Sequence, residues 1–452
     1  MSQWRNFQII TFCLPLPFGA NVDWAWPVFV AAILMMLGLE LRARVADAQH
    51  RLLPVVPWPE PLKRSRWLVM ALFAVQAWVA VQWAVVSVAP YDTLTALLKG
   101  LGYSAWFVLA LLILDSRERM ERLIWVVTLA AAFQAFYGAT MVMTGWELTF
   151  FRAKDTYIGN AVGTFVNRNS FAGYLEMCLA LGIGALLAQS ARYEGSWRAR
   201  MRQLAAVLLS PKIIMRLLLA MMVIALVMSR SRMGNSAFFA SMMIAGVFAL
   251  LLMRHKTTAT TVLLGSLLVI DIFIVGAFFG IDKVAERLEQ TSADSEQRDE
   301  MTIDAFHMWQ SAPLTGVGAG TTLVNSSRFK QETTFPLWVD HPHNDYVQFL
   351  SEFGAPAFAV LLGVVVTCWW NTLAAMRTRR SDFYRGMGFA ACMGITAIGI
   401  HSAVDFNLQI PANALMFVLL LAIAQIARYA PHEAGSSPDS GSHTRRRKHR
   451  SA

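Results

Sequence analysis

The segment His341–Tyr346, with the sequence HPHNDY, places two histidines and a carboxylate within six residues. It ends the longest polar stretch of a chain that is otherwise mostly apolar. The apolar run that follows, from Phe353 to about Trp370, is long enough to enter a lipid bilayer. The sequence therefore predicts a polar cluster held at a membrane surface. A base with a near-neutral pKa at that place suits chemistry on a lipid-linked substrate better than passage of a solute.

The composition of the chain supports this placement. Of its 452 residues, 56% are hydrophobic, and the mean hydropathy is +0.46. These values exclude a soluble globular protein and indicate an all-α polytopic membrane protein. A spanning helix needs ~20 mostly apolar residues. This rule predicts about twelve transmembrane helices, at 5–20, 24–41, 67–89, 93–114, 121–143, 169–189, 213–229, 233–253, 260–280, 353–376, 384–404 and 410–428.

The basic residues predict the orientation of these spans. If the N-terminus is cytoplasmic, most of the 39 Lys and Arg fall in cytoplasmic segments, as the positive-inside rule requires. An even number of spans then returns the C-terminus to the cytoplasm. The net charge of +10 therefore mostly reflects basic residues in the predicted cytoplasmic segments. We interpret the basic tail as a disordered cytoplasmic segment and expect no nucleic-acid partner.

The pattern divides the chain into four parts. Residues 1–280 hold the first nine spans, and 281–352 form one large loop on the outer side. Residues 353–428 hold the last three spans, and 429–452 form the tail. Within the loop, apolar residues at helical spacing predict short helices at 282–290 and 296–311, followed by a glycine-rich turn.

Three arginines on the outer side are candidate phosphate ligands. Arg230 and Arg232 lie in a tight turn between two spans, where unpaired guanidinium groups are unfavourable. Planar guanidinium groups suit phosphate, although these two could instead reach lipid headgroups. Arg298 opposes the dipole at the start of its predicted helix. Its anionic partner is either a neighbouring carboxylate, Glu296 or Glu300, or a substrate phosphate.

The histidines are the candidate bases. His341 and His343 are two residues apart, so in extended chain they point the same way. One of them could act as a general base oriented by Asp345 or Asp340, or the two could be purely structural. A metal site would need a third ligand, such as Asp345 or His307. The sequence has no close-set carboxylate cluster, and we expect no metal.

A second histidine–carboxylate pair occurs near the last predicted turn. His401 and Asp405 are four residues apart, which places them on one face of a helix. Such a pair inside a membrane is either functional or a packing hydrogen bond, and the sequence leaves both interpretations open.

Together these stretches resemble the O-antigen ligase and polymerase family of bacterial inner-membrane glycosyltransferases over roughly residues 160–425. The resemblance rests on Gly163–Tyr174, Ser229–Arg232, Arg298 with Trp309 and Pro313–Gly318, His343–Gly354 and His401–Pro411. Asn235 and Ser236 stand where an aromatic residue often follows the arginine turn. This departure leaves open whether Arg230 or Arg232 is the family's arginine.

The resemblance implies a GT-C-like integral-membrane fold with its site facing the periplasm. It implies an O-antigen ligase that transfers O-antigen from undecaprenyl pyrophosphate to lipid A-core by metal-independent, inverting glycosyl transfer, without a cofactor. His343 would be the catalytic base, and Arg230, Arg232 and Arg298 would bind the donor pyrophosphate. The supporting residues would be Arg168, His341, Asn344, Asp345, His401 and Asp405.

Three other functions fit much of the same pattern. An O-antigen polymerase and a protein O-oligosaccharyltransferase would use the same kind of lipid-linked donor. A secondary transporter would carry paired broken helices and charges near the bilayer midplane. Here the charged candidates lie at the outer boundary, which favours an enzyme.

Overall fold

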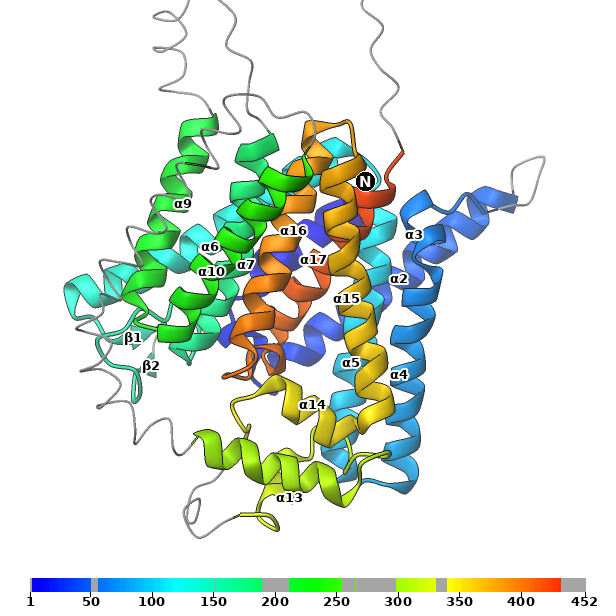
Figure 1. The fold of residues 1–452 in the computed structure, drawn as a ribbon, viewed down its shortest axis with the longest axis vertical. Helices are drawn as coiled ribbons and strands as arrows, with labels where there is room; N and C mark the ends of the chain where they lie inside the picture. Colours follow the sequence, from blue (N-terminus) through cyan, green and yellow to red (C-terminus); the bar gives the residue numbers. More distant parts are fainter. Residues whose placement is uncertain are drawn as a thin grey trace, which may run out of the picture.

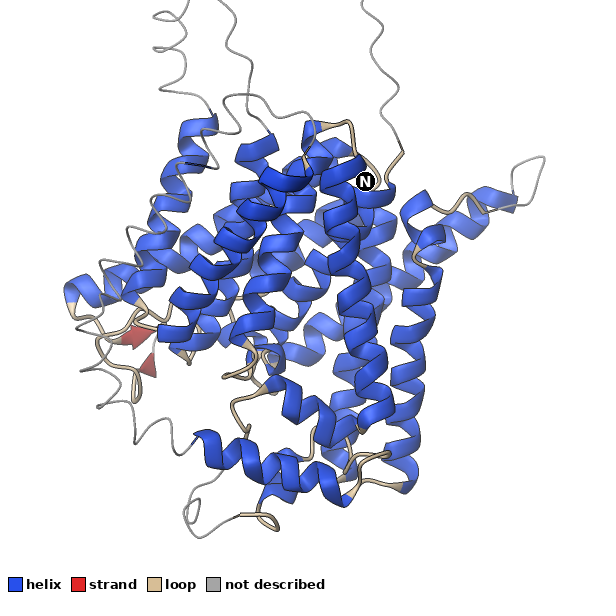
Figure 2. Cartoon of the chain, viewed as in Figure 1, coloured by secondary structure: helices blue, strands red, loops and turns tan. Residues whose placement is uncertain are grey.

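The structure is a computed structural model that describes residues 2–49, 56–150, 152–188, 211–253, 265, 298–330 and 340–431. Helices dominate this part of the chain (Figure 2). Eight of them are long and apolar enough to cross a membrane. They are α4 (Arg66–Val85), α5 (Pro90–Ile113), α6 (Arg117–Thr144), α7 (Arg168–Ala188), α10 (Arg232–Leu252), α15 (Ala355–Thr378), α16 (Asp382–His401) and α17 (Pro411–Tyr429).

The first predicted span, 5–20, is wrong as a single helix. Helix α1 (Ser2–Cys13) has 12 residues, too few to cross a bilayer. Pro15 and Pro17 follow it, and a short 3-10 helix, η1 (Phe18–Ala20), continues the chain. Proline lacks the backbone N–H that a continuing helix would need.

Three further predicted spans are not among the eight. The segment 24–41 lies in α2 (Ala25–Gln49), which continues into charged sequence. The segment 213–229 lies in α9 (Pro211–Met228), whose apolar part, Ile213–Met228, is shorter than the others. The segment 260–280 lies outside the described residues, apart from Gly265. The structure thus supports a polytopic helical protein without confirming twelve spans.

The remaining elements are short. Helix α3 (Glu60–Arg64) precedes α4, and η2 (Asn407–Gln409) precedes α17. Strands β1 (Leu148–Thr149) and β2 (Arg152–Ala153) form an antiparallel pair that the sequence did not predict. The large loop contains a helix at 298–311, which agrees with the predicted helix at 296–311. It also contains α13 (Thr322–Ser326) and α14 (Asp345–Phe353), whereas the predicted helix at 282–290 lies outside the described residues.

Helices α7, α16 and α17 form the buried centre of the bundle, while α4 and α15 are much more exposed. Close approach of α7 and α16 depends on glycine. A Cβ on Gly184 would lie 2.6 Å from the carbonyl oxygen of Gly386, and one on Gly386 would lie 2.5 Å from that of Gly184. Because these backbones nearly touch, polar side chains at the ends of α7 and α16 are held in a rigid frame.

The loop segments pack beneath one end of the bundle, and the amino terminus and the end of α17 lie at the opposite end (Figure 1). Two hydrogen bonds from the side chain of Gln82 in α4 hold this layer, one to the carbonyl of Thr315 at 2.6 Å and one to that of Glu352 at 2.8 Å. Gly316 makes the necessary turn with a φ of +66°, a conformation that favours glycine.

We expect Gly316→Ala to lower the thermal stability of the protein more than Gly145→Ala does. Both glycines adopt a left-handed conformation, with φ of +66° and +68°, which costs about 1 kcal/mol for alanine. A Cβ at Gly316 would also lie 2.2 Å from the carbonyl oxygen of Glu352, whereas one at Gly145 would meet nothing within 4 Å. Thermal unfolding in lipid nanodiscs measures the difference. Equal losses would show that the loop layer is not tightly packed against α14.

Candidate functional site

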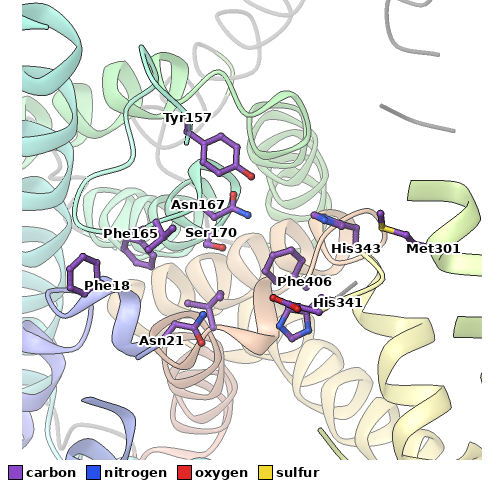
Figure 3. Close-up of a pocket in the computed structure, with 13 residues that line it drawn as sticks. Phe18, Asn21, Tyr157, Phe165, Asn167, Ser170, Met301, His341, His343 and Phe406 are labelled. Carbon is purple, nitrogen blue, oxygen red and sulfur yellow. The ribbon is translucent and has the colours of Figure 1, made fainter. Parts of the chain in front are cut away.

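A cavity of about 370 Å³ opens where the loop layer meets the bundle (Figure 3). Five regions of the chain contribute to its wall: the segment around η1, the stretch leading into α7, the helix at 298–311, and the two turns at 340–343 and 406–410. The residues that line it are Phe18, Asn21, Tyr157, Phe165, Val166, Asn167, Ser170, Met301, Asp340, His341, His343, Phe406 and Ile410. The cavity therefore joins segments that are far apart in sequence around the two histidines.

The backbone at His343 turns sharply instead of being extended. Its φ is +51°, so the predicted extended conformation is wrong at this residue. The cause is the start of α14, where the backbone N–H of Asp345 donates to the carbonyl of Ser402 at 2.9 Å. Both imidazoles nevertheless contact the ring of Phe406, with centroid distances of 4.6 Å for His341 and 4.8 Å for His343. The two histidines thus contact one aromatic ring, although the backbone at His343 is not extended.

The carboxylate beside His343 is Asp405. Its Oδ1 lies 3.5 Å from Nδ1 of His343, which is ion-pair distance but longer than a well-formed hydrogen bond. Burial opposes the charge on Asp405, but His343, the charge of His401 and the backbone N–H of Phe406 together lower its pKa. Asp405 is thus the carboxylate that faces Nδ1 of His343, where the sequence suggested Asp345 or Asp340.

Asp345 instead joins α14 to the turn before α17. Its carboxyl group accepts hydrogen bonds from the hydroxyl of Ser402 at 2.8 Å, the backbone N–H of Leu408 at 3.0 Å and the amide of Gln409 at 3.0 Å. Burial raises the pKa of Asp345 to about 7, although these three donors oppose the rise. The side-chain oxygen of Asn344 caps α14 by accepting from the N–H of Val347 at 3.1 Å. Both residues therefore position the histidine segment.

The two histidines of the cavity have different surroundings. Nδ1 of His341 lies 3.1 Å from the side-chain amide of Gln348, and burial lowers the pKa of His341 to about 4. His341 is therefore a neutral imidazole at physiological pH. Nδ1 of His343 faces the buried carboxylate of Asp405 instead.

His401 and Asp405 do not share a helix, because α16 ends at His401 and Asp405 lies in the following turn. Nε2 of His401 is still 4.0 Å from Oδ2 of Asp405, and its Nδ1 is 2.8 Å from Oε1 of Glu176. Glu176 is fully buried in α7, and the sequence interpretation missed it. The available signal was a lone acidic residue inside an otherwise apolar predicted span.

None of the predicted phosphate-binding arginines is among the described residues that line the cavity. Arg230, with φ of +52°, and Arg232, the first residue of α10, are both exposed. The N–H of Ala161 donates to the carbonyl of Met228 at 3.1 Å. This bond ties the arginine turn to the stretch that leads into α7.

Tyr157 connects Arg168 and Arg298 with the cavity. Burial and the charge of Asp405 raise the pKa of Tyr157, while Arg168 and Arg298 oppose the rise, so all three charged groups lie near its ring. The guanidinium of Arg168 lies 5.5 Å from the ring centroid. Its Nε is buried without a hydrogen-bond partner among the described residues. Tyr157 is thus a candidate site residue that the sequence did not single out.

No metal-binding cluster of three His, Cys, Asp or Glu side chains occurs in the part of the chain that the structure describes. Asp345, one of the third ligands considered from the sequence, binds Ser402 and Gln409 instead.

We expect Asp345→Asn to change the pH dependence of stability. The folded pKa of about 7 lies above the ordinary value of ~3.9. The carboxyl group therefore stabilises the fold fully below about pH 4, and this contribution is lost as the pH rises towards 7. Asparagine does not titrate, so its disadvantage relative to wild type should shrink over this interval. Thermal unfolding at several pH values measures this, and parallel curves would contradict it.

Asp345→Leu is the matching control, because it removes every acceptor. It leaves buried donors on Ser402, Leu408 and Gln409 without partners, at about 1–3 kcal/mol each. We therefore expect it to be less stable than Asp345→Asn at every pH.

Comparison with known proteins gives one family. No curated protein matches this chain. A family model described as O-antigen ligase matches residues 217–362, a segment that includes α10, the histidine segment, α14 and the first part of α15. Members of this family are glycosyltransferase-like enzymes of O-antigen or glycan transfer. This match supports the resemblance that the motifs predicted, because residues 217–362 are similar to the O-antigen ligase family.

Proposed function

We propose that the protein is an O-antigen ligase that moves a polysaccharide from undecaprenyl pyrophosphate to lipid A-core. The observation that carries this proposal is the position of His343, on a cavity wall with Asp405 at its Nδ1. When a carboxylate faces Nδ1 of a histidine, Nε2 is left to accept a proton from a substrate hydroxyl. His343 is therefore the general base of the proposed reaction.

The proposed transfer is one in-line displacement. The acceptor hydroxyl loses its proton to His343 and attacks the anomeric carbon of the donor sugar. The bond from that carbon to the pyrophosphate oxygen breaks, and undecaprenyl pyrophosphate leaves with the electron pair. A single displacement inverts the anomeric centre. Asp405 stabilises the imidazolium that forms on His343, as a buried carboxylate does in other histidine-dependent enzymes.

Cationic side chains around the cavity would stabilise the leaving pyrophosphate. Arg298 lies one helical turn before Met301, which lines the cavity, and Arg168 lies beside Tyr157. Arg230 and Arg232 occupy the adjoining exposed turn. Preorganised guanidinium groups can stabilise developing phosphate charge, so the reaction is proposed to run without a metal ion or cofactor.

A second cavity supports a lipid-linked substrate. It has a volume of about 520 Å³, shares Asn21, Asp340 and His341 with the first cavity, and is lined mostly by apolar side chains of α5, α15, α16 and α17. An apolar chamber continuous with a polar site suits a lipid whose hydrocarbon tail lies among the spans. We place the protein in the bacterial inner membrane, with this site facing the periplasm and both termini in the cytoplasm.

Two related enzymes and a transporter remain alternatives. A polymerase would lengthen the lipid-linked glycan, and a protein O-oligosaccharyltransferase would transfer it to Ser or Thr. A secondary transporter would need charged groups at the middle of the spans. Glu176 lies within α7, but His343, Asp405 and Arg168 lie at one end of the bundle, which favours transfer chemistry.

We expect His343→Gln to lower glycan transfer by about 10²–10⁴-fold, the usual contribution of a general base. His341→Gln is the matched control, because His341 lines the same cavity but is held neutral by burial, and it should retain far more activity. The test is lipopolysaccharide laddering in a deletion strain complemented with each variant at equal expression. A ladder restored by His343→Gln would overturn the proposed base.

The same deletion strain separates the alternative functions. Loss of ligation leaves uncapped lipid A-core and accumulated undecaprenyl-linked polymer. A core that carries a single repeat unit would indicate a polymerase. An unchanged ladder would favour protein glycosylation or transport.

We expect Leu361→Trp to impair transfer more than Val366→Trp. Both residues lie in α15, but Leu361 lines the apolar chamber, whereas Val366 is 54% exposed on the outer surface of the bundle. The larger ring would occupy the space proposed for a hydrocarbon tail. Transfer assays at increasing concentrations of lipid-linked donor and of acceptor measure the effect. Equal activity of the two variants would exclude this chamber as a substrate site.

A further inference from the structure

A row of four titratable side chains extends from the cavity into the bundle. His343 faces Asp405 at 3.5 Å, Asp405 faces His401 at 4.0 Å, and His401 contacts Glu176 at 2.8 Å. Glu176 and His401 have no exposed surface, and Asp405 is 1% exposed. The cavity exposes the first member alone, so the inner three groups cannot bind substrate directly.

Four polar atoms of this row have no hydrogen-bond partner in the part of the chain that the structure describes. Oε2 of Glu176, Nε2 of His401, Oδ2 of Asp405 and Nδ1 of His343 are all buried without a hydrogen bond among the described residues. Buried polar groups are normally satisfied. Here the unsatisfied atoms of His401, Asp405 and His343 face their neighbours in the row, across distances slightly longer than a hydrogen bond.

The geometry at His401 determines its charge. Both of its ring nitrogens face carboxylate oxygens, one of Glu176 and one of Asp405. Carboxylates only accept hydrogen bonds, so an imidazole between two of them satisfies both when each nitrogen carries a proton. The charged groups that act on Glu176 are His401 and Asp405.

The helices around Glu176 pack closely against its carboxylate. Helix α10 presents Gly234 to this carboxylate, and a Cβ there would lie 3.1 Å from Oε1 of Glu176. Gly234 is in the first turn of α10, where its N–H donates to the capping hydroxyl of Ser231 at 3.2 Å. Glu176 thus lies directly beneath the arginine turn as well as next to His401.

We propose that Glu176 is a positioning residue of the transfer reaction, which keeps His401 as an imidazolium and thereby holds Asp405 ionised and directed at His343. This inference rests on the proposed function, because it assigns the role of base to His343. Buried ion pairs contribute little to stability, so a functional role explains the row better than folding does. This relay of charge, from Glu176 through His401 and Asp405, ends at Nδ1 of His343. No proton passes along it.

The test compares Glu176→Gln with wild type in lipid nanodiscs. Glutamine keeps the shape of the side chain but removes the negative charge, so His401 should become neutral. Asp405 then loses the nearby positive charge that lowers its pKa. We expect the acid limb of the rate against pH to move to higher pH, and kcat to fall about tenfold with little change in KM.

A second measurement does not depend on activity. The ring-nitrogen shifts of His401 in protein labelled with ¹⁵N-histidine, assigned by comparison with His401→Gln, report its protonation directly. We expect a fully protonated ring in wild type near pH 7 and a neutral ring in Glu176→Gln. A neutral His401 in wild type, or an unchanged ring in Glu176→Gln, would overturn the relay.

The two measurements distinguish the proposals. If wild type transfers no glycan but the shifts of His401 change as expected, the proposed function fails and the relay stands. If wild type is active and Glu176→Gln keeps its pH profile and rate, the relay fails. Gln425→Leu, which removes a buried amide bonded to Asn371 and Cys368, controls for general destabilisation and should leave the pH profile unchanged.

Discussion

The hydrogen bonds of Asp345 are the interaction on which the site depends. They fix the first turn of α14 to the turn between α16 and α17, through Ser402, Leu408 and Gln409. The histidine segment immediately precedes α14, so its position follows from this junction. The backbone N–H of Asp345, which donates to the carbonyl of Ser402, and the ring contact of His343 with Phe406 support the same placement. A buried carboxyl group is unfavourable unless its acceptors are filled, and here three donors fill them.

Apolar runs predicted most of the bundle, because a bilayer allows few alternatives to a long helix. The eight long apolar helices all correspond to predicted spans. The interpretation was weaker where proline and charge interrupt the pattern. Residues 5–20 have enough apolar character for a span, but Pro15 and Pro17 end the helix early. Length and hydropathy count apolar residues, whereas a helix also requires continuous backbone hydrogen bonds.

The sequence predicted several residues of the candidate site, but it only partly predicted which of them face one another. The sequence identified His343, Asp345, His401 and Asp405, and the structure brings all four to one region of the fold. It could not show that Asp405, 62 positions further along the chain, would face His343 in place of the nearby Asp345. Pairings between distant segments depend on how helices pack, which spacing along the chain does not encode. Tyr157 was missed for the same reason, whereas Glu176 had a signal in the sequence as a lone acidic residue within an apolar span.

The arrangement of charge explains how one site could serve two lipid substrates. The arginines lie around the cavity and in an exposed turn, where long side chains can keep their charged ends in water. His343 contacts Phe406 at the cavity wall, whereas Asp405, His401 and Glu176 are buried. A phosphate group would therefore meet the guanidinium groups directly and these buried carboxylates only at longer range. In the proposed reaction, the base His343 lies beside the negative charge of Asp405, which favours transfer of a proton to the imidazole. In the proposed reaction, cations near the cavity and anions beneath the base would give the leaving group and the attacking hydroxyl opposite electrostatic environments.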